Sequence, residues 1–192
     1  MEVVQAIRTR RSMGKLTDHR PPRELVERLI EAACWAPNHF MTQPWRFWVL
    51  TGRAREALGE AMARGLSARL QAQGKAPTPE QLEGERTRPL RAPVVIVVAV
   101  EPKIEDPRVV EVEEIAAGAA AVQNLLLAAH GSGLAAYWRT GSAAYDPVVK
   151  AHLGLSERAH ILGFVYLGYP DGELPPPKPR DPSSRTVWQG WE

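Results

Sequence analysis

Four residues of types that bind phosphate stand together near the start of the chain: Arg8, Arg10, Arg11 and Ser12. The guanidinium group of arginine is a planar fork that binds phosphate oxygens in pairs, and a neighbouring hydroxyl adds one more donor. The same cations would also stabilise the last turn of a helix by about 0.3–1 kcal/mol each. The spacing is therefore typical of either a phosphate site or a helix end.

A second group occupies the proline-bounded segment 36–45, APNHFMTQPW. It brings together Asn38, His39 and Gln43, with Trp45 beside them. Amide and imidazole groups can donate and accept hydrogen bonds at once, as the edge of a heterocycle with mixed polar groups requires. The alternative is a polar connection whose side chains bond to their own backbone, although such dense loops favour a functional role.

A third group, YWRTG at 137–141, offers Trp138 for stacking and Arg139 for an electron-rich ring or a phosphate. It could equally be a strand end that carries a surface arginine. The segment GSGLAA at 131–136 matches G-x-G-x-x-A, but a dinucleotide fingerprint must follow a strand and open a helix. Here the predicted order is reversed, so these glycines are interpreted as a helix C-cap and a turn.

The composition is that of one globular domain over residues 1–192. The chain has a mass of 21.2 kDa, with 44% hydrophobic and 24% charged residues. Its net charge of +2 argues against general nucleic-acid or membrane binding. The single Cys34 excludes an intrachain disulfide and a zinc site made of several thiolates, and we interpret it as a packing residue.

The sequence suggests neither a membrane span nor an export signal. The longest aliphatic run, 93–100, is far shorter than the roughly 18 apolar residues that cross a bilayer, and charged residues occupy the N-terminal region. We therefore expect a cytoplasmic protein. The histidines lack zinc-ligand spacing, so no metal site is predicted. The acidic residues Glu111, Glu113 and Glu114 are interpreted as charges at a helix start.

Periodicity predicts helices and strands in alternation along the chain. The expected helices are 2–11, a segment opened by Pro21 and Pro22 and ended by Pro37, then 53–72, 111–130 and 146–153. The expected strands are 45–51, 93–100, 134–139 and 160–168. The polar, proline-broken stretch 73–92 is predicted to be a mobile excursion, and 169–192 a proline-rich tail whose two tryptophans are anchored on something such as a partner chain. The element order alone is compatible with a parallel α/β sheet.

The three polar groups, taken in this order, resemble the nitroreductase family of FMN-dependent oxidoreductases. The likeness is carried by AIRTRRS, APNHFMTQPWRFWVL, AAYWRTGSAAYDPVVKAHLGL and ILGFVYLG, and it covers essentially the whole chain. It is closest to the short bacterial members described as NAD(P)H nitroreductases. The resemblance implies an α+β fold with a central, mainly antiparallel sheet flanked by helices. It also implies a homodimer that completes the domain and holds FMN at its interface.

The resemblance also implies which residues contact the cofactor. Its N-terminal flavin contact is matched by Arg10, Arg11 and Ser12, and its later contact by Trp138, Arg139 and Thr140. Other matched positions are Trp35 and His39, with Asn38 and Gln43 in a loop that often reaches the partner subunit's FMN, and Arg180 as a basic residue for the phosphate. Many members carry a cation two residues after the serine, near flavin N1. This chain has Gly14 there, and Lys15 is the natural substitute.

The family's chemistry implies hydride transfer from NAD(P)H, followed by reduction of a nitroaromatic, quinone or similar small acceptor at the same place. Because FMN carries this redox chemistry, no dedicated catalytic residue is expected. The alternative is a flavin-binding offshoot with little NAD(P)H turnover, in a flavin-fragmenting, dehalogenating or storage role. The residues favour neither NADH nor NADPH, and they leave the physiological acceptor open. We expect segment 73–92 to line or cover the pocket.

Overall fold

The computed structural model describes residues 1–103, 105–174, 176–178 and 180–191. The helices are α1 (Val3–Thr9), α2 (Arg23–Cys34), α3 (Arg53–Ala72), α4 (Pro79–Thr87), α5 (Glu111–Gly131) and α6 (Pro147–His152). The strands are β1 (Trp45–Leu50), β2 (Val94–Val100), β3 (Ala135–Arg139) and β4 (His160–Gly168). Short 3-10 turns lie at His39–Met41, Arg88–Arg91, Ser142–Tyr145 and Ser183–Arg185.

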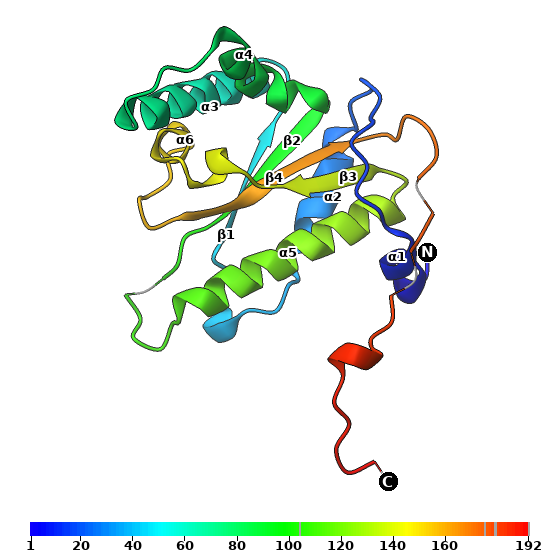
Figure 1. Ribbon diagram of the computed structural model, residues 1–192. Coiled ribbons are helices and arrows are strands. Elements are labelled where there is room, and N and C mark those ends of the chain that lie inside the picture. Colours follow the sequence, from blue (N-terminus) through cyan, green and yellow to red (C-terminus); the bar gives the residue numbers. More distant parts are fainter. Residues whose placement is uncertain (104, 175, 179, 192) are drawn as a thin grey trace.

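The four strands form one antiparallel sheet in the order β1-β2-β4-β3. The predicted α+β fold with a mainly antiparallel central sheet is therefore confirmed, and the parallel arrangement is excluded (Figure 1). All seven residues of β2 are buried, because helices cover both faces of the sheet. β1 and β3 are the edge strands.

Alternate residues of the strands build two apolar cores, one on each face of the sheet. The first core joins α2 and α5 to Val94, Ile96 and Val98. The second joins α3 and α6 to Val95 and Val97. The period-2 alternation of side chains across a strand produces this division. β3 therefore presents Ala136 to the first core and Tyr137 to the second.

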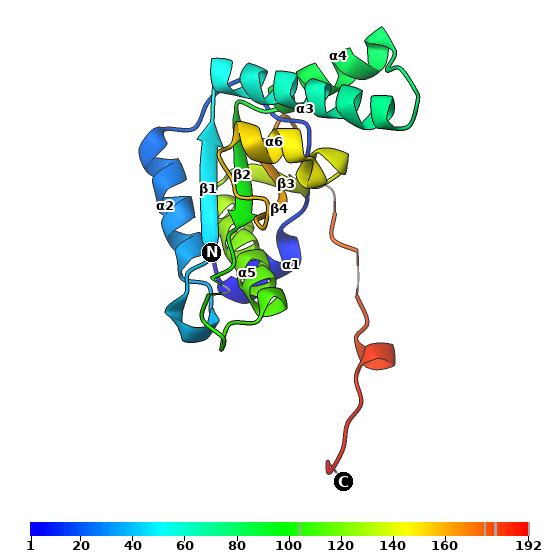
Figure 2. The same cartoon turned by 90° about the vertical axis from the view of Figure 1, so that its left-hand side faces the viewer.

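Segment 73–92 differs from the mobile excursion that we predicted, because it contains helix α4 and a 3-10 turn. Thr78 caps the helix with a reciprocal capping box to Gln81, and Pro79 occupies its first turn, where the absent N–H of proline is not needed. α4 packs on α3 at Gly59, where a Cβ would lie only 2.1 Å from the carbonyl oxygen of Arg86. The two helices form a pair at one end of the body (Figures 1 and 2).

Small residues let α5 lie close to the sheet. A Cβ on Gly118 would lie 2.4 Å from Cγ2 of Val100 and 2.6 Å from Cδ1 of Leu162, so only glycine permits this approach. Of the described helices, α5 alone has the length and hydropathy of a membrane span, and 44% of that window is buried inside the fold. Its apolar character is accounted for by packing against α2 and the sheet.

The C-terminal tail leaves the body after β4 and extends away from it (Figures 1 and 2). Trp188 and Trp191 are exposed and contact each other edge to face, with ring centroids 5.4 Å apart. Two exposed indole rings on an extended chain form an apolar surface that the rest of the described chain does not cover.

Candidate functional site

The first part of the candidate site is a group of arginines at the end of α1. Nη1 of Arg10 is buried and has no hydrogen-bond partner among the described residues. The charges of Arg11 and Arg180 act on Arg10, and together with burial, the larger cause, they lower its pKa. Arg11 and Arg180 therefore lie close enough to Arg10 for their charges to act on it. None of the ion pairs within the described ranges includes any of these three.

This arrangement fits an anionic ligand. A buried N–H group without an acceptor is costly, by about 1–3 kcal/mol, unless something accepts its hydrogen bond. Three guanidinium groups without a carboxylate also repel one another, so the missing acceptor should carry negative charge. A phosphate meets both requirements, because its oxygens accept several charge-assisted bonds at once.

His130, which our sequence reasoning did not select, belongs to the same group. It lies in the last turn of α5, and its Nε2 is 2.8 Å from the hydroxyl oxygen of Thr9. Burial and the charges of Arg10 and Arg11 lower its pKa. Only the tertiary contact between α1 and α5 places His130 in this group, because in the chain it stands more than a hundred residues from Arg10 and Arg11.

Ser12 connects the arginines to edge strand β3. It forms an isolated parallel bridge with Ala136, which places it two residues from Trp138 along the neighbouring strand. Nε1 of Trp138 donates a 2.8 Å hydrogen bond to the carbonyl of Leu162. Arg139 ends the strand and Thr140 follows it, both exposed. The N-terminal and YWRTG groups predicted from the sequence therefore share one edge of the sheet.

The second part of the site is the loop 38–43. The backbone N–H of Gln43 donates to Oδ1 of Asn38 over 3.0 Å, and Nδ1 of His39 is 2.8 Å from a carboxylate oxygen of Glu113. Phe40, Met41 and Gln43 adopt φ angles of 51°, 53° and 46°, which are uncommon for residues other than glycine.

Two acidic residues of α5 hold this loop in place. Glu113 pairs with His39, and the buried Glu114 accepts a hydrogen bond from the hydroxyl of Thr42 over 2.6 Å. Nε2 of His160 contacts Glu111 in the same helical turn. Our interpretation of these acids as charges at a helix start was incomplete, because each also binds a specific side chain far away in the sequence.

The structure does not bring the two parts together within one chain. Loop 38–43 lies at the N-terminal end of α5, and α1 with its arginines lies at the C-terminal end (Figure 1). The 21 residues of α5 span about 31 Å at 1.5 Å per residue. Trp35, the residue that caps the C-terminal end of α2, is 81% exposed and precedes the loop in the chain.

Two further expectations were tested by the side-chain positions. Lys15 forms an exposed ion pair with Asp171 at 3.1 Å, so in this structure its cation is directed to that carboxylate. Cys34 is exposed, and the interpretation of it as a packing residue is wrong. Within the described ranges, no group of three or more His, Cys, Asp or Glu side chains is arranged to hold a metal.

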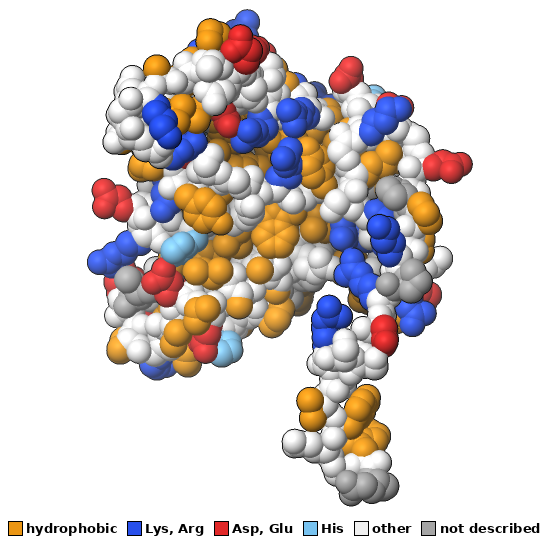
Figure 3. Space-filling view, in the orientation of Figure 1, with side chains coloured by type: hydrophobic (Ala, Val, Ile, Leu, Met, Phe, Trp, Pro, Cys, Tyr) orange, Lys and Arg blue, Asp and Glu red, His pale blue; other side chains and the backbone are white. Residues whose placement is uncertain are grey.

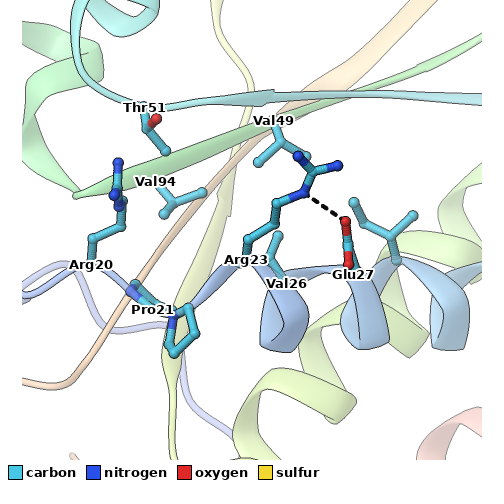
Figure 4. Close-up of a pocket in the computed structure, with 10 residues that line it drawn as sticks. Arg20, Pro21, Arg23, Val26, Glu27, Val49, Thr51 and Val94 are labelled. Carbon is cyan, nitrogen blue, oxygen red and sulfur yellow. Dashed lines mark hydrogen bonds and ion pairs between the residues drawn. The ribbon is translucent and has the colours of Figure 1, made fainter.

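A groove of about 670 Å³ lies elsewhere, between α2 and edge strand β1 (Figure 4). Arg23 pairs with Glu27 along its wall, while Val26, Val49 and Val94 supply apolar surface. None of the residues predicted to bind the cofactor lines this groove. On the face shown in Figure 3, cationic side chains border an apolar surface.

Comparisons with known proteins agree with the motifs. The family model "Nitroreductase family" matches residues 7–169. The Escherichia coli (strain K12) protein named "Putative NAD(P)H nitroreductase YdjA" is 30% identical over 170 residues, covering 88% of this chain and 89% of that protein. A nitroreductase-like family protein from Bacillus cereus has a TM-score of 0.83 at 25% identity, covering 99% of this chain and 97% of that chain. A nitroreductase with bound FMN from Bacteroides fragilis NCTC 9343 has a TM-score of 0.73 at 26% identity, covering 98% of this chain and 100% of that chain. The chain therefore belongs to the nitroreductase family.

Proposed function

We propose that this protein is an FMN-dependent oxidoreductase that takes a hydride from NAD(P)H and reduces a nitroaromatic, a quinone or a similar small acceptor. The observation that carries this proposal is the buried Nη1 of Arg10, which has no hydrogen-bond partner in the described part of the chain, beside Arg11 and Arg180. Such a group needs an anionic acceptor, and the phosphate of FMN supplies one. Membership of the family and the FMN-bound relative support the choice of this phosphate compound.

In this proposal the residues at the edge of the sheet hold the two ends of the cofactor. Arg10, Arg11 and Arg180 bind its phosphate, while Ser12 and the segment 138–140 contact its ring. Bound FMN supplies the redox chemistry, accepting two electrons as a hydride and passing them on. The protein orients the ring through the fixed indole of Trp138, whose bond to Leu162 locks its position.

The second part of the site comes from a second copy of the chain. Trp35, Asn38, His39 and Gln43 lie at the far end of α5 from the arginines, so a single chain cannot place both groups on one cofactor. A two-fold axis across α5 would bring the loop of one protomer to the arginines of its partner. The exposed apolar residues on α5 and the tail, including Val112 and Trp188, are surfaces that such a homodimer would bury.

NAD(P)H and the acceptor use the same place in turn in this ping-pong scheme. For a nitroaromatic, the balanced first reduction consumes one NAD(P)H and one proton and yields the nitroso compound, NAD(P)⁺ and water. For a quinone, the same two electrons and two protons yield the hydroquinone. We place this activity in the cytoplasm, which supplies NAD(P)H.

Steady-state turnover tests the proposal. The FMN-reconstituted protein should oxidise NADH or NADPH in the presence of a quinone such as menadione, with product formed in equal amount. Varying both substrates should give parallel double-reciprocal lines, as expected when the first product leaves before the second substrate binds. Bound FMN without turnover of either nicotinamide would instead support a flavin-binding role, and would overturn the proposed reaction.

A further inference from the structure

Three arginines gather around a pair of stacked tyrosines near the end of β3. The rings of Tyr137 and Tyr166 stack with centroids 4.9 Å apart, and Cζ of Arg139 lies 5.9 Å from the ring centroid of Tyr137. Arg88 and Arg91 bound the 3-10 turn that leads into β2, the strand beside Tyr166 in the sheet. Arg139 thus lies against the aromatic pair, and the turn that carries Arg88 and Arg91 leads into the strand that pairs with Tyr166.

The cluster of Arg88, Arg91 and Arg139 has an excess of positive charge. Arg88 pairs with Glu85 at 2.8 Å, whereas no ion pair in the described part of the chain includes Arg91 or Arg139. The charges of the three arginines also act on the hydroxyl of Tyr166, where they oppose burial and Tyr137, which raise its pKa to about 12. One carboxylate for three guanidinium groups leaves capacity for a further anion.

The cluster of Arg88, Arg91 and Arg139 lies beside the N-terminal segment that we assign to the cofactor. A Cβ on Gly14 would be 3.3 Å from Cε1 of Tyr137, so the stretch that follows Ser12 runs directly over the tyrosine pair. A Cβ on Gly168 would be 2.9 Å from Cγ of Pro93 and 3.4 Å from Cβ of Leu16. Pro93 comes two residues after Arg91, so the turn and the N-terminal segment pass on either side of the same glycine.

We propose that Arg88, Arg91 and Arg139 bind an anionic group, a carboxylate or a phosphate, on a molecule that exchanges electrons with the bound cofactor. This inference rests on the proposed function, since it assigns the anion to a substrate of that reaction. Guanidinium forks match carboxylate and phosphate oxygens in pairs.

Two molecules carry such a group. An aromatic acceptor could present a carboxylate, and NADPH presents a 2′-phosphate that NADH lacks. Both would place a ring over the cofactor and a negative charge at its rim. The experiment therefore compares a charged and an uncharged member of each pair: 4-nitrobenzoate with 4-nitrobenzyl alcohol, and NADPH with NADH.

Arg91→Gln is the informative variant, because Arg91 is exposed and has no acidic partner among the described residues. Arg88 is unsuitable, since its removal would leave the buried Glu85 unpaired. In Arg91→Gln, kcat/KM should fall by about fivefold to twentyfold for one anionic substrate and stay within twofold for its neutral counterpart. Arg91→Lys should recover part of the loss. Arg28→Gln, which removes an exposed charge from α2 on the other face of the sheet, is the matched control.

A binding measurement without turnover separates this inference from the proposed function. Calorimetric titration of 4-nitrobenzoate and of NADP⁺ into the oxidised protein, without reductant, should show weaker binding of one of them to Arg91→Gln. If Arg91→Gln binds 4-nitrobenzoate more weakly, the anion belongs to the acceptor. If it binds NADP⁺ more weakly, the anion belongs to the nicotinamide nucleotide. Equal affinities in the wild-type protein and Arg91→Gln would overturn the inference, whether or not the enzyme turns over.

Discussion

The carboxylate of Glu114, 1% exposed in the core, accepts a 2.6 Å hydrogen bond from the hydroxyl of Thr42, 72 residues earlier in the chain. This contact ties loop 38–43 to the first turns of α5. The loop contains three residues with positive φ, a conformation that must be held by surrounding contacts because it is intrinsically unfavourable. Glu114 therefore positions a loop that we assign to the partner subunit's cofactor.

Thr42→Val should destabilise the protein, because it removes the short hydroxyl hydrogen bond to the buried carboxylate of Glu114 and leaves it the 3.4 Å bond from the backbone N–H of Lys103. We expect the free energy of unfolding to fall by about 1–3 kcal/mol, measured by urea denaturation. Thr42→Ser keeps the hydroxyl and should cost clearly less. A loss below about 0.5 kcal/mol in Thr42→Val, within the range of ordinary surface changes, would contradict this role.

Gly163→Ala should disturb the indole of Trp138. Gly163 has φ 147°, and a Cβ there would lie 2.4 Å from both Nε1 of Trp138 and the carbonyl oxygen of Arg139. We expect a loss of stability of about 1–3 kcal/mol, with a shift in tryptophan fluorescence and weaker FMN binding. Gly84→Ala is the control: it lies in helix α4 with open space around its Cβ. That variant should gain about 0.5–1 kcal/mol. Similar effects of the two substitutions would refute this account of Gly163.

His130 should make stability and cofactor binding depend on pH. Burial and the charges of Arg10 and Arg11 lower its pKa from the ordinary value of 6.5, so the unfolded chain binds a proton more readily than the folded one. The contribution of the neutral His130 imidazole to the free energy of unfolding is therefore complete above pH 6.5 and decreases as the pH falls below that value.

A bound phosphate would oppose the arginine charges and raise the pKa of His130. NMR titration of its imidazole, assigned with His130→Gln, should show this rise when FMN is added, together with proton uptake. His19, whose ring centroid lies 5.1 Å from that of Tyr169 in a tilted arrangement, provides an internal reference. An unchanged pKa of His130 on FMN binding would mean that the phosphate does not bind next to this residue.

A hybrid dimer tests whether each site is shared between two chains. One chain carries Arg10→Ala and the other carries Trp35→Ala with His39→Ala, and different affinity tags allow the heterodimer to be isolated. In a shared arrangement one site receives both defects and the other receives none, so the hybrid should bind about half the FMN of the wild-type dimer. Each mutant homodimer should bind little. A hybrid without FMN would mean that each site is built within a single chain.

Long periodic segments were predictable from the sequence. The helix 53–72 and the strand 160–168 have the predicted bounds, because their composition and apolar period agree with their final environment. Helix α4 was missed, since Pro79 and the prolines around it look like breaks. In the structure Pro79 starts the helix, and the pairing with α3 supplies the stability that its polar sequence lacks.

The residues of the candidate site stay a prediction from the sequence and the family resemblance, whereas their arrangement in space could not be predicted. Arg10, Ser12 and Trp138 share one sheet edge, which the sequence order suggested only through the family resemblance. The distance between that edge and His39 depends on how α5 crosses the sheet, and local patterns carry no information about it. The contacts of Glu114 and His130 are likewise tertiary, so they were found only in the structure.

The central claim is that this chain binds FMN and that NAD(P)H reduces it. The most direct measurement is the visible spectrum of the FMN-reconstituted protein, freed of unbound flavin and followed anaerobically as NADH or NADPH is added. The account predicts the absorption bands of oxidised flavin and their bleaching by about one equivalent of at least one nicotinamide. A protein that retains no flavin after reconstitution, or whose bound flavin neither nicotinamide bleaches, would contradict it.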